Sequence, residues 1–301
     1  MRVFKGLNKA GRFKKPVIAL GVFDGVHRGH INILKDASRR AHSIGGTSIA
    51  LTFDPHPQKE ESLSSLEHRL RLIAQQGIDV CVVINFNRNF QKMSAEDFIK
   101  NILSGKLQAF YIYVGRNFRF GRRAEGSVAT LKRFSKILHF KLKIFKVIKT
   151  NHQPISSTYI RALIKKGKLF AAKKLLCRPV TVLGSVRMGL KIGSRLGFPT
   201  ANIDPHHEVM PPPGVYVVRI IFGSRRYNGI CNIGTRPTIT KKRKIQIEVH
   251  IFNFHKNIYA KFLEIEFIKK IREEIKFPNS CALTEQIRKD VTFAKALFSR
   301  H

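Results

Sequence analysis

The sequence lacks several features that would place a protein in a class at once. No apolar run approaches the roughly 18 residues of a membrane-spanning helix, and residues 1–15 contain no apolar core of the signal-peptide type. The four cysteines are scattered without C-x-x-C spacing, which argues against a disulfide framework and a zinc site. We therefore expect a cytoplasmic protein with reduced thiols and no membrane partner.

Acidic residues are also scarce. The chain of 301 residues has 19 Asp and Glu against 56 Lys and Arg, a net charge of +37. Such a charge is typical of a nucleic-acid-binding protein, or of a lysine-rich surface around a site for anionic nucleotides. The basic residues are spread over both halves and no nucleic-acid-binding motif accompanies them. We expect no specific nucleic-acid partner, and the sequence leaves the oligomeric state open.

The common phosphate-binding loops are absent as well, because neither G-x-x-x-x-G-K-[ST] nor G-x-G-x-x-G occurs. Instead, the apolar run Val17–Leu20 leads into GVFDGVHRGH, Gly21–His30. The next segment has apolar residues at helical spacing and ends at Gly45 and Gly46. This order predicts a strand, a glycine-rich turn and a helix. Backbone N–H groups and the helix dipole then favour a phosphate at the turn.

His27 and His30 are the candidate catalytic residues of this turn, since imidazoles can donate hydrogen bonds to phosphoryl oxygens. By themselves they could equally be surface histidines of an ordinary turn. With its neighbours, the turn resembles the nucleotide-binding motif of nucleotidyltransferases, most closely that of the FAD synthetase half of bifunctional bacterial riboflavin kinase/FAD synthetases. The resemblance implies that the ATP-binding residues here are Gly21, Phe23, Asp24, Gly25 and Gly29.

The rest of the first half alternates predicted strands and helices. One helix is expected to begin at Ser94, with Asp97 at capping-box spacing. Alternation of this kind predicts a parallel sheet with helices on both faces, and ligands bind at the carboxyl ends of such strands. By the resemblance the fold is a Rossmann-like α/β nucleotidyltransferase fold. Further strands are predicted within Thr47–Pro57, where Asp54-Pro55-His56-Pro57 ends the strand, and at Val80–Ile84, Tyr111–Val114 and Ile144–Ile148.

A loop rich in Gly, Arg and Phe follows the predicted strand at residue 114. Tyr113–Gly126 is either a mobile basic loop or a site whose rings pack a flat ligand and whose arginines meet phosphate. It resembles the V-G-x-[DN]-F-x-F-G segment of FAD synthetases. The resemblance implies that Asn117, Phe118 and Phe120 bind flavin.

Ile155–Leu169 predicts a helix with Ser157 as its N-cap, an end near Lys166 and Gly167 as its stop. Capping alone would explain the serine. The segment also resembles the family motif S-S-T-x-I-R. That resemblance implies that the ATP phosphates are held by Ser157, Thr158 and Arg161.

From about Pro179 the pattern changes to strands that follow one another, at Val180–Leu183, Val215–Ile221, Ile245–Phe252 and Phe262–Phe267. This predicts an antiparallel sheet or small barrel, with a final amphipathic helix over residues 283–298 that packs on it. We expect two domains, 1–178 and 179–301. The resemblance names them as an FAD synthetase domain and a riboflavin kinase β-barrel with a C-terminal helix.

Gly184–Asn202 predicts a glycine-rich loop that passes close over a ligand. It resembles the riboflavin kinase signature that ends in G-F-P-T-A-N, except that Ser194 stands where the family usually has Arg. The resemblance implies that Thr200 and Asn202 bind Mg²⁺ and that ATP is held by Gly184, Gly189, Gly193, Thr200 and Asn202.

Glu248 lies on the polar face of a predicted strand, which by pattern alone indicates a solvent-facing residue. The family resemblance instead makes it the general base that takes the proton of the flavin 5′-hydroxyl. The segment after it resembles the family's L-Y-G and R-x-E-x-K-F motifs, with Ala260 in place of Gly. There the resemblance assigns Arg272 to flavin binding.

These resemblances cover residues 15–295 and imply one function for the whole chain. ATP with Mg²⁺ would phosphorylate riboflavin to FMN, and a second ATP would adenylylate FMN to FAD with release of pyrophosphate. Two rivals remain: a nucleotidyltransferase with another phosphate substrate, which leaves Glu248 unexplained, and a basic nucleic-acid-binding protein, which explains only the charge.

Overall fold

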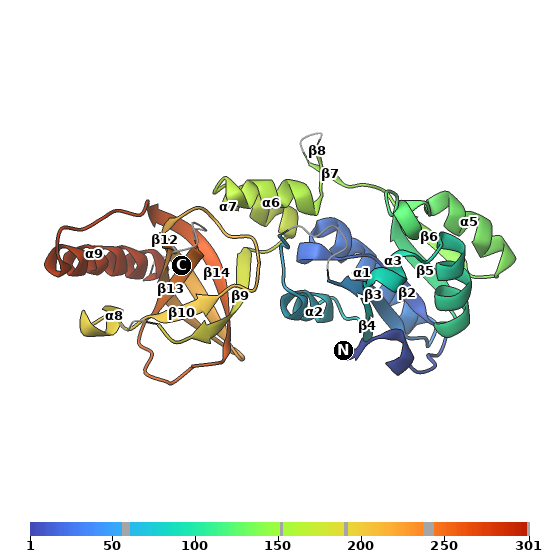
Figure 1. Cartoon of the computed structure of the whole chain (residues 1–301), viewed down its shortest axis with the longest axis horizontal. Coiled ribbons are helices and arrows are strands. Elements are labelled where there is room, and N and C mark those ends of the chain that lie inside the picture. The colour runs from blue at the N-terminus through green and yellow to red at the C-terminus, as the bar shows by residue number, and fades with distance from the viewer. Residues whose placement is uncertain (56–60, 151–152, 190–191, 237–243, 300–301) are drawn as a thin grey trace. The chain divides into compact units, whose positions relative to one another are not determined.

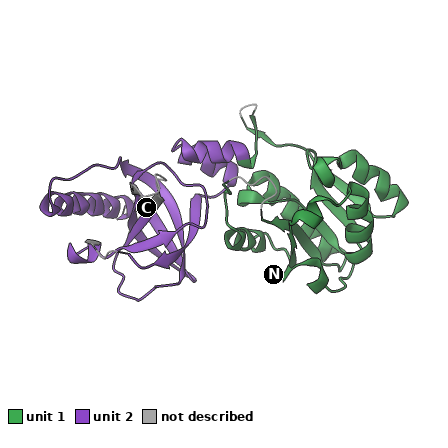
Figure 2. Cartoon of the chain, viewed as in Figure 1, with its two compact units in different colours: residues 1–157 green, residues 158–301 purple. Residues whose placement is uncertain are grey.

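The computed structural model describes residues 1–55, 61–150, 153–189, 192–236 and 244–299. Packing divides the chain into two compact units, residues 1–157 and residues 158–301 (Figure 2). The division falls at the start of helix α6 (Ser157–Lys165), and the next helix, α7 (Leu169–Leu176), packs on strands β9 (Val180–Arg187) and β14 (Phe262–Arg272) of the second unit. The predicted boundary between residues 178 and 179 is a statement about which fragments fold by themselves, and it stays a prediction.

The first unit contains a sheet of six parallel strands in the order β1-β4-β3-β2-β5-β6 (Figure 1). This confirms the predicted parallel sheet. The edge strand β1 was not predicted, and β6 begins before the expected Ile144. Of the predicted strand Thr47–Pro57, His56 and Pro57 lie outside the described residues. The strands are β1 (Arg2–Lys5), β2 (Val17–Leu20), β3 (Ser48–Asp54), β4 (Val80–Asn85), β5 (Tyr111–Gly115) and β6 (Lys141–Phe145).

Helices cover both faces of this sheet because successive strand residues are apolar. In β2, Val17 and Ala19 pack in a cluster with α1 and α2, whereas Ile18 and Leu20 pack in a second cluster with residues of α4, η3 and α5. Ser94 caps α4 by accepting a bond from Asp97 N, as predicted. The helices are α1 (Arg28–Ser43), α2 (Leu66–Ala74), α3 (Arg88–Gln91), α4 (Ala95–Asp97), the π-helical η3 (Phe98–Lys106) and α5 (Val128–Ile137); a hairpin β7 (Lys149–Thr150) and β8 (Gln153–Pro154) and helix α6 (Ser157–Lys165) follow.

The strand order has a switch point beside β2. From β2 the chain runs through β3 and β4 toward one edge, and then returns to β5 on the other side of β2. Because β2 and β5 are neighbouring parallel strands, the loops that follow them leave the sheet side by side. A switch point of this kind is where ligands bind in open α/β sheets. The fold thus brings the predicted turn 21–30 and the predicted loop 113–126 to one edge.

The second unit is a closed antiparallel barrel in the order β10-β13-β12-β11-β14-β9. The predicted barrel is confirmed, although β10 and β12 were not predicted. A short helix α8 (Ile192–Arg195) lies between β9 and β10 along the chain. The strands are β9 (Val180–Arg187), β10 (Ala201–Asp204), β11 (Gly214–Phe222), β12 (Arg225–Arg236), β13 (Lys244–Ile251) and β14 (Phe262–Arg272).

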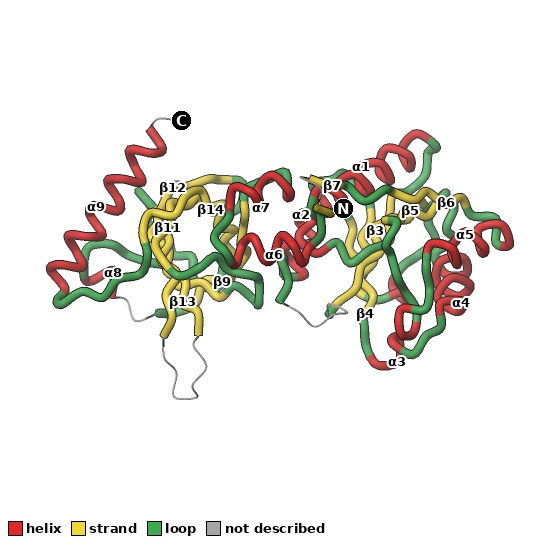
Figure 3. The backbone as a smooth tube through the Cα atoms, turned by 90° about the horizontal axis from the view of Figure 1, so that it is seen from above, coloured by secondary structure: helices red, strands yellow, loops and turns green. Residues whose placement is uncertain are grey.

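Helix α9 (Ser280–Ser299) packs against the outside of the barrel beside β12 (Figure 3), as its amphipathic pattern predicts. Ala294 is fully buried among Val217, Ile230 and Phe252. The barrel strands therefore have an inner apolar face and an outer face that α9 partly covers. In the described parts of the chain, no helix is long and apolar enough to cross a membrane.

Candidate functional site

The turn after β2 is built on left-handed backbone. Phe23 has φ of 56° and Gly25 has φ of 71°. A Cβ on Gly25 would lie 2.6 Å from Leu63 Cδ1, so glycine is required there for space as well as for conformation. The Phe23 side chain is fully buried, which leaves only its backbone for the predicted contact with ATP.

Asp24 holds this turn in place. Its buried carboxylate accepts hydrogen bonds from Leu63 N (3.1 Å) and Ser64 N (3.2 Å), and Ser64 Oγ in turn accepts from Gly25 N (3.0 Å). An ionised carboxylate with backbone donors makes strong bonds. Asp24 thus organises the backbone around the turn, a role that its short sequence motif does not indicate.

His27 begins helix α1 as its N-cap. Its Nδ1 accepts from Gly29 N (3.2 Å) and His30 N (3.4 Å), so the neutral ring carries its proton on Nε2. The ring stacks on His30 with centroids 3.7 Å apart. The close approach of Gly29 to this ring leaves a Cβ there 3.1 Å from His27 Cε1, which favours glycine.

His30 is uncharged at neutral pH. Burial, and then the charges of His27 and Arg69, hold the pKa of His30 well below its ordinary value. Its edge-on contact with Phe23, 5.3 Å between centroids, fixes the ring. Within the described residues no protein atom bonds its buried Nδ1. A buried ring nitrogen without a partner at a phosphate-type turn is suited to bind an external oxygen.

Ser157 reaches the same turn. Its hydroxyl donates to Asp24 O over 2.9 Å. The prediction that Ser157 caps the helix is wrong, because α6 begins at Ser157 itself and its hydroxyl bonds the turn. Thr158 and the buried Arg161 follow in α6, and Gly167 ends the helix region with φ of 69°, as predicted.

The loop after β5 lines a cavity of about 320 Å³ with Arg116, Asn117, Phe118 and Arg119. Asn117 is exposed and Phe118 is half-buried. Phe120, by contrast, is buried in the core and stacks behind Phe118 with centroids 5.7 Å apart. Phe120 therefore supports the ring of Phe118, and of the three residues predicted to bind flavin, Asn117 and Phe118 line the cavity.

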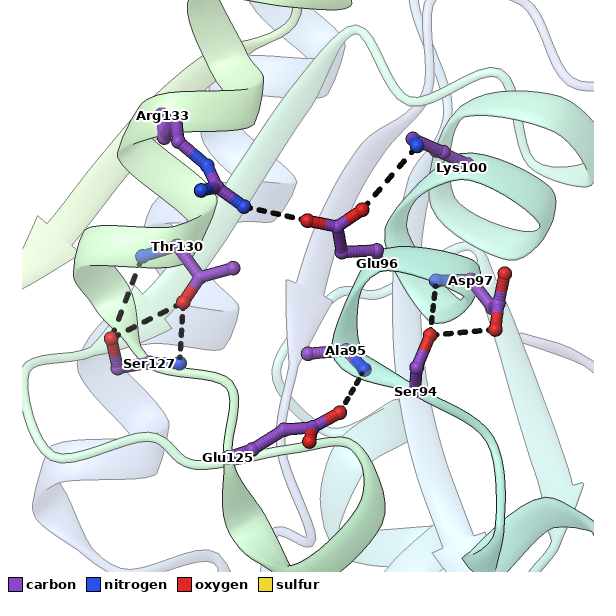
Figure 4. A network of polar contacts seen from close by, with 9 residues as sticks. All are labelled: Ser94, Ala95, Glu96, Asp97, Lys100, Glu125, Ser127, Thr130 and Arg133. Atoms are coloured by element: carbon purple, nitrogen blue, oxygen red, sulfur yellow. Dashed lines mark hydrogen bonds and ion pairs between the residues drawn. The ribbon is translucent and has the colours of Figure 1, made fainter.

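Glu125, the one acidic residue in Tyr113–Gly126, anchors this loop (Figure 4). Its Oε1 accepts from Ala95 N at the start of α4 (2.9 Å). Gly121 lies so close that a Cβ there would come within 2.7 Å of Ala95 N. The loop is thus fixed against α4, which the reading of a mobile basic loop did not anticipate.

The second unit has a cavity of about 320 Å³ on the outer face of the barrel, between β13 and α9. Glu248 on β13 lies opposite Asn202 on β10 and opposite Asn232 on β12, so the three side chains form a row across three strands. Leu283 and Asp290 of α9 line the same cavity. Glu248 is therefore a half-buried cavity residue and not the solvent-facing residue that its pattern alone indicates.

The glycine-rich segment closes around Asn202 and Thr200. A Cβ on Gly189 would lie 2.0 Å from Asn202 Nδ2, and one on Gly193 would lie 3.0 Å from Thr200 Oγ1. The loop backbone therefore approaches Thr200 and Asn202, the two residues predicted to bind Mg²⁺, as closely as glycine allows. Gly184 differs, because it lies within β9 and a Cβ there would meet Ile203 of β10 at 2.3 Å. Gly184 is therefore part of the barrel wall and not of the loop around Thr200 and Asn202.

Arg272 also lines this cavity and is held by Asp290. Its Nε and Nη2 donate to both carboxylate oxygens of Asp290, at 2.8 to 3.2 Å, and Asp290 is almost fully buried. A bidentate pair of this kind fixes the guanidinium plane. Ala260, where the family usually has Gly, has φ of 59°, a conformation that glycine adopts without strain. Ser194, the other departure, is exposed.

Comparisons with known proteins match both halves of the chain. A family model for FAD synthetase matches residues 10–159, and one for riboflavin kinase matches residues 176–298. The chain belongs to the bifunctional riboflavin kinase/FMN adenylyltransferase family. It is 35% identical to the Buchnera aphidicola (Schizaphis graminum) member over 99% of both chains, and 36% identical to that of Haemophilus influenzae over 99% of this chain and 100% of the relative.

The family fold extends to a solved structure. A crystal structure described as a macrolide-efflux protein from Streptococcus pneumoniae superposes with a TM-score of 0.84 at 25% identity, over 98% of this chain and 99% of that one. The match spans both units, so the pairing of an α/β unit with a barrel recurs there in one chain.

Proposed function

We infer that the protein makes FMN from riboflavin and FAD from FMN, each with ATP. One observation supports this conclusion most: the first unit stacks two histidines at a glycine-rich turn, and the second places a carboxylate opposite Asn202, so each has groups suited to an ATP site. Neither a single-step transferase nor a nucleic-acid-binding protein needs both.

In the second unit, we propose that Glu248 is the general base. As the riboflavin 5′-oxygen attacks the γ-phosphorus of ATP, its proton passes to the Glu248 carboxylate and ADP leaves. The loop around Gly189 and Gly193 would bring backbone N–H groups to the ATP phosphates. Arg272, oriented by Asp290, would contact the flavin from the wall of the cavity.

Mg²⁺ fits the chemistry of this site. Within the described residues no group of three or more His, Cys, Asp or Glu side chains could hold a metal ion by itself. The Asn202 amide oxygen and the Thr200 hydroxyl are neutral oxygen donors, which suits an ion that keeps phosphate and water ligands. When bound, Mg²⁺ would offset charge on the ATP phosphates.

In the first unit, an oxygen of the FMN phosphate would attack the α-phosphorus of ATP, and the bond to the bridging oxygen of pyrophosphate would break. The nucleophile is already an anion, so no strong base is needed. His27 and His30 would donate hydrogen bonds to the charge that develops on the transferred and departing phosphates. Within this unit, Ser157 would hold ATP, and Asn117 and Phe118 would hold the flavin.

The direct test is to incubate the purified protein with riboflavin and Mg·ATP and to separate the flavins by chromatography over time. We expect FMN to appear first and FAD to follow, with neither formed when Mg²⁺ is chelated. Accumulation of FMN alone would leave only the kinase. Absence of any phosphorylated flavin would contradict the inferred function.

The domain boundary gives a further prediction. A fragment of residues 179–301 should phosphorylate riboflavin and make no FAD, because it contains the barrel and its cavity and lacks the turn at Gly21–His30. A fragment of residues 158–301 should melt at a higher temperature than the fragment of residues 179–301, since it also contains the buried Leu175 and Leu176 of α7. Activity assays and thermal melts test this, and loss of phosphorylation in both fragments would contradict it.

A further inference from the structure

We propose that Gln246 is a positioning residue for riboflavin phosphorylation: its amide group holds Glu248 and Asn202 in the arrangement that the reaction requires. The proposal rests on the inferred kinase function of the second unit and extends it to a residue that no motif indicates. Gln246 precedes the predicted base by two residues on β13 and lines the same cavity.

The contacts are specific. Gln246 Nε2 donates to Glu248 Oε1 over 2.7 Å and to Asn202 Oδ1 over 3.0 Å. A primary amide has two hydrogens, so one nitrogen can make both bonds. The bond to Glu248 is charge-assisted and therefore among the stronger kind. Asn202 lies on another strand, β10, so a single side chain ties together groups from two strands.

The arrangement decides which atoms of Asn202 and Glu248 face the substrate. With Asn202 Oδ1 turned toward Gln246, one oxygen lone pair accepts the bond and the second stays available to a cation. Without Gln246, the Asn202 amide is free to rotate and donate its own N–H to Glu248, since the two residues lie directly opposite. That rotation would engage the Glu248 carboxylate in a hydrogen bond. It would also turn Asn202 Oδ1 away from the position where it can bind a cation.

The space around Gln246 supports a single orientation. Its partner across the strand pair is Gly234 on β12, which has no side chain; Glu274 Oε1 lies over this position, 2.6 Å from where a Cβ would be. On the other side, Gly189 leaves only enough room for the Asn202 amide itself, because a Cβ there would lie 2.0 Å from Nδ2. Gln246 thus lies next to the confined Asn202 amide that it holds, and the residue opposite it on β12 is a glycine.

Gln246→Leu tests the proposal, since leucine is similar in size and donates no hydrogen bond. We expect kcat for riboflavin phosphorylation to fall by about 10- to 100-fold, the loss typical of a hydrogen bond to a charged group, while KM for riboflavin stays within about twofold. Gln246→Glu, which places a second carboxylate beside Glu248, should lose at least as much. FAD synthesis from supplied FMN by the same proteins should stay at the parent rate.

Gln286→Leu is the matched control. Gln286 Nε2 also donates to a buried carboxylate, Asp290 Oδ1 at 3.0 Å, and bonds neither Asn202 nor Glu248. Because Asp290 orients Arg272, we expect this variant to raise KM for riboflavin while kcat stays within about twofold, with thermal melts that show both proteins folded. A kcat within twofold of the parent in either Gln246 variant, or an equal loss in Gln286→Leu, would overturn the proposal. Failure of the parent protein to make FMN would instead overturn the kinase function.

Discussion

His30→Ala should abolish FAD synthesis from FMN while riboflavin phosphorylation continues at the parent rate. The His30 ring lies on His27 and against Phe23, with a buried nitrogen that no protein atom bonds within the described residues. Removal of one fixed donor from a site of developing charge typically lowers a rate by about 10²- to 10³-fold. The rate of FAD formation from FMN and Mg·ATP, followed by chromatography, measures the effect.

His42→Ala is the control for this prediction. His42 lies near the other end of the same helix, where its exposed ring bonds Asp79 over 3.1 Å. An exposed side-chain contact contributes little, so both activities should stay near the parent values. His30 is a cleaner test than His27, because His27 also caps α1 and its loss would weaken the helix. Undiminished FAD synthesis in His30→Ala would exclude the assignment.

Glu248→Gln should lower riboflavin phosphorylation and spare FAD synthesis, the opposite of the effect of His30→Ala. Glutamine keeps the size and polarity of the side chain and cannot take the proton of the riboflavin hydroxyl. General-base catalysis contributes roughly 10²- to 10⁴-fold, so FMN formation should fall by about that factor. FAD synthesis from supplied FMN should be almost unchanged, because Glu248 and the turn at Gly21–His30 belong to different units.

Glu266→Gln is the corresponding control in the barrel. Glu266 on β14 pairs with Arg219 over 3.3 Å and does not line the cavity. The substitution should lower stability, because the Glu266 side chain is mostly buried beside Arg219, and should change riboflavin phosphorylation by less than about twofold. If Glu248→Gln instead phosphorylates riboflavin at the parent rate, then Glu248 is not the base.

The sequence predicted most strands where hydrophobic runs are uninterrupted, as at Val17–Leu20, since such runs favour a sheet buried on both faces. Strand β12 was not predicted, and it contains Asn228-Gly229, a pair typical of a hairpin turn. In the structure Gly229 lies inside the strand, where a Cβ would meet His250 O at 2.3 Å. Close approach between strands, and not a turn, explains this glycine.

The candidate sites were predictable to the extent that their residues are adjacent in sequence. The turn at Gly21–His30 needs only local pattern. The environment of Glu248 needs tertiary structure, because α9 is what converts the polar face of β13 into a cavity wall. Asp290 and Glu125 were missed for the same reason: each bonds a residue at least 18 positions away in the chain, Arg272 and Ala95 respectively.

The most direct test of two separate sites in one chain is to mix the two full-length variants. His30→Ala alone should convert riboflavin to FMN and stop there, and Glu248→Gln alone should convert supplied FMN to FAD but make little from riboflavin. Incubated together with riboflavin and Mg·ATP, the two proteins should produce FAD, because FMN released by one is the substrate of the other. A mixture that makes no FAD, although each variant keeps its remaining activity, would contradict this division of labour.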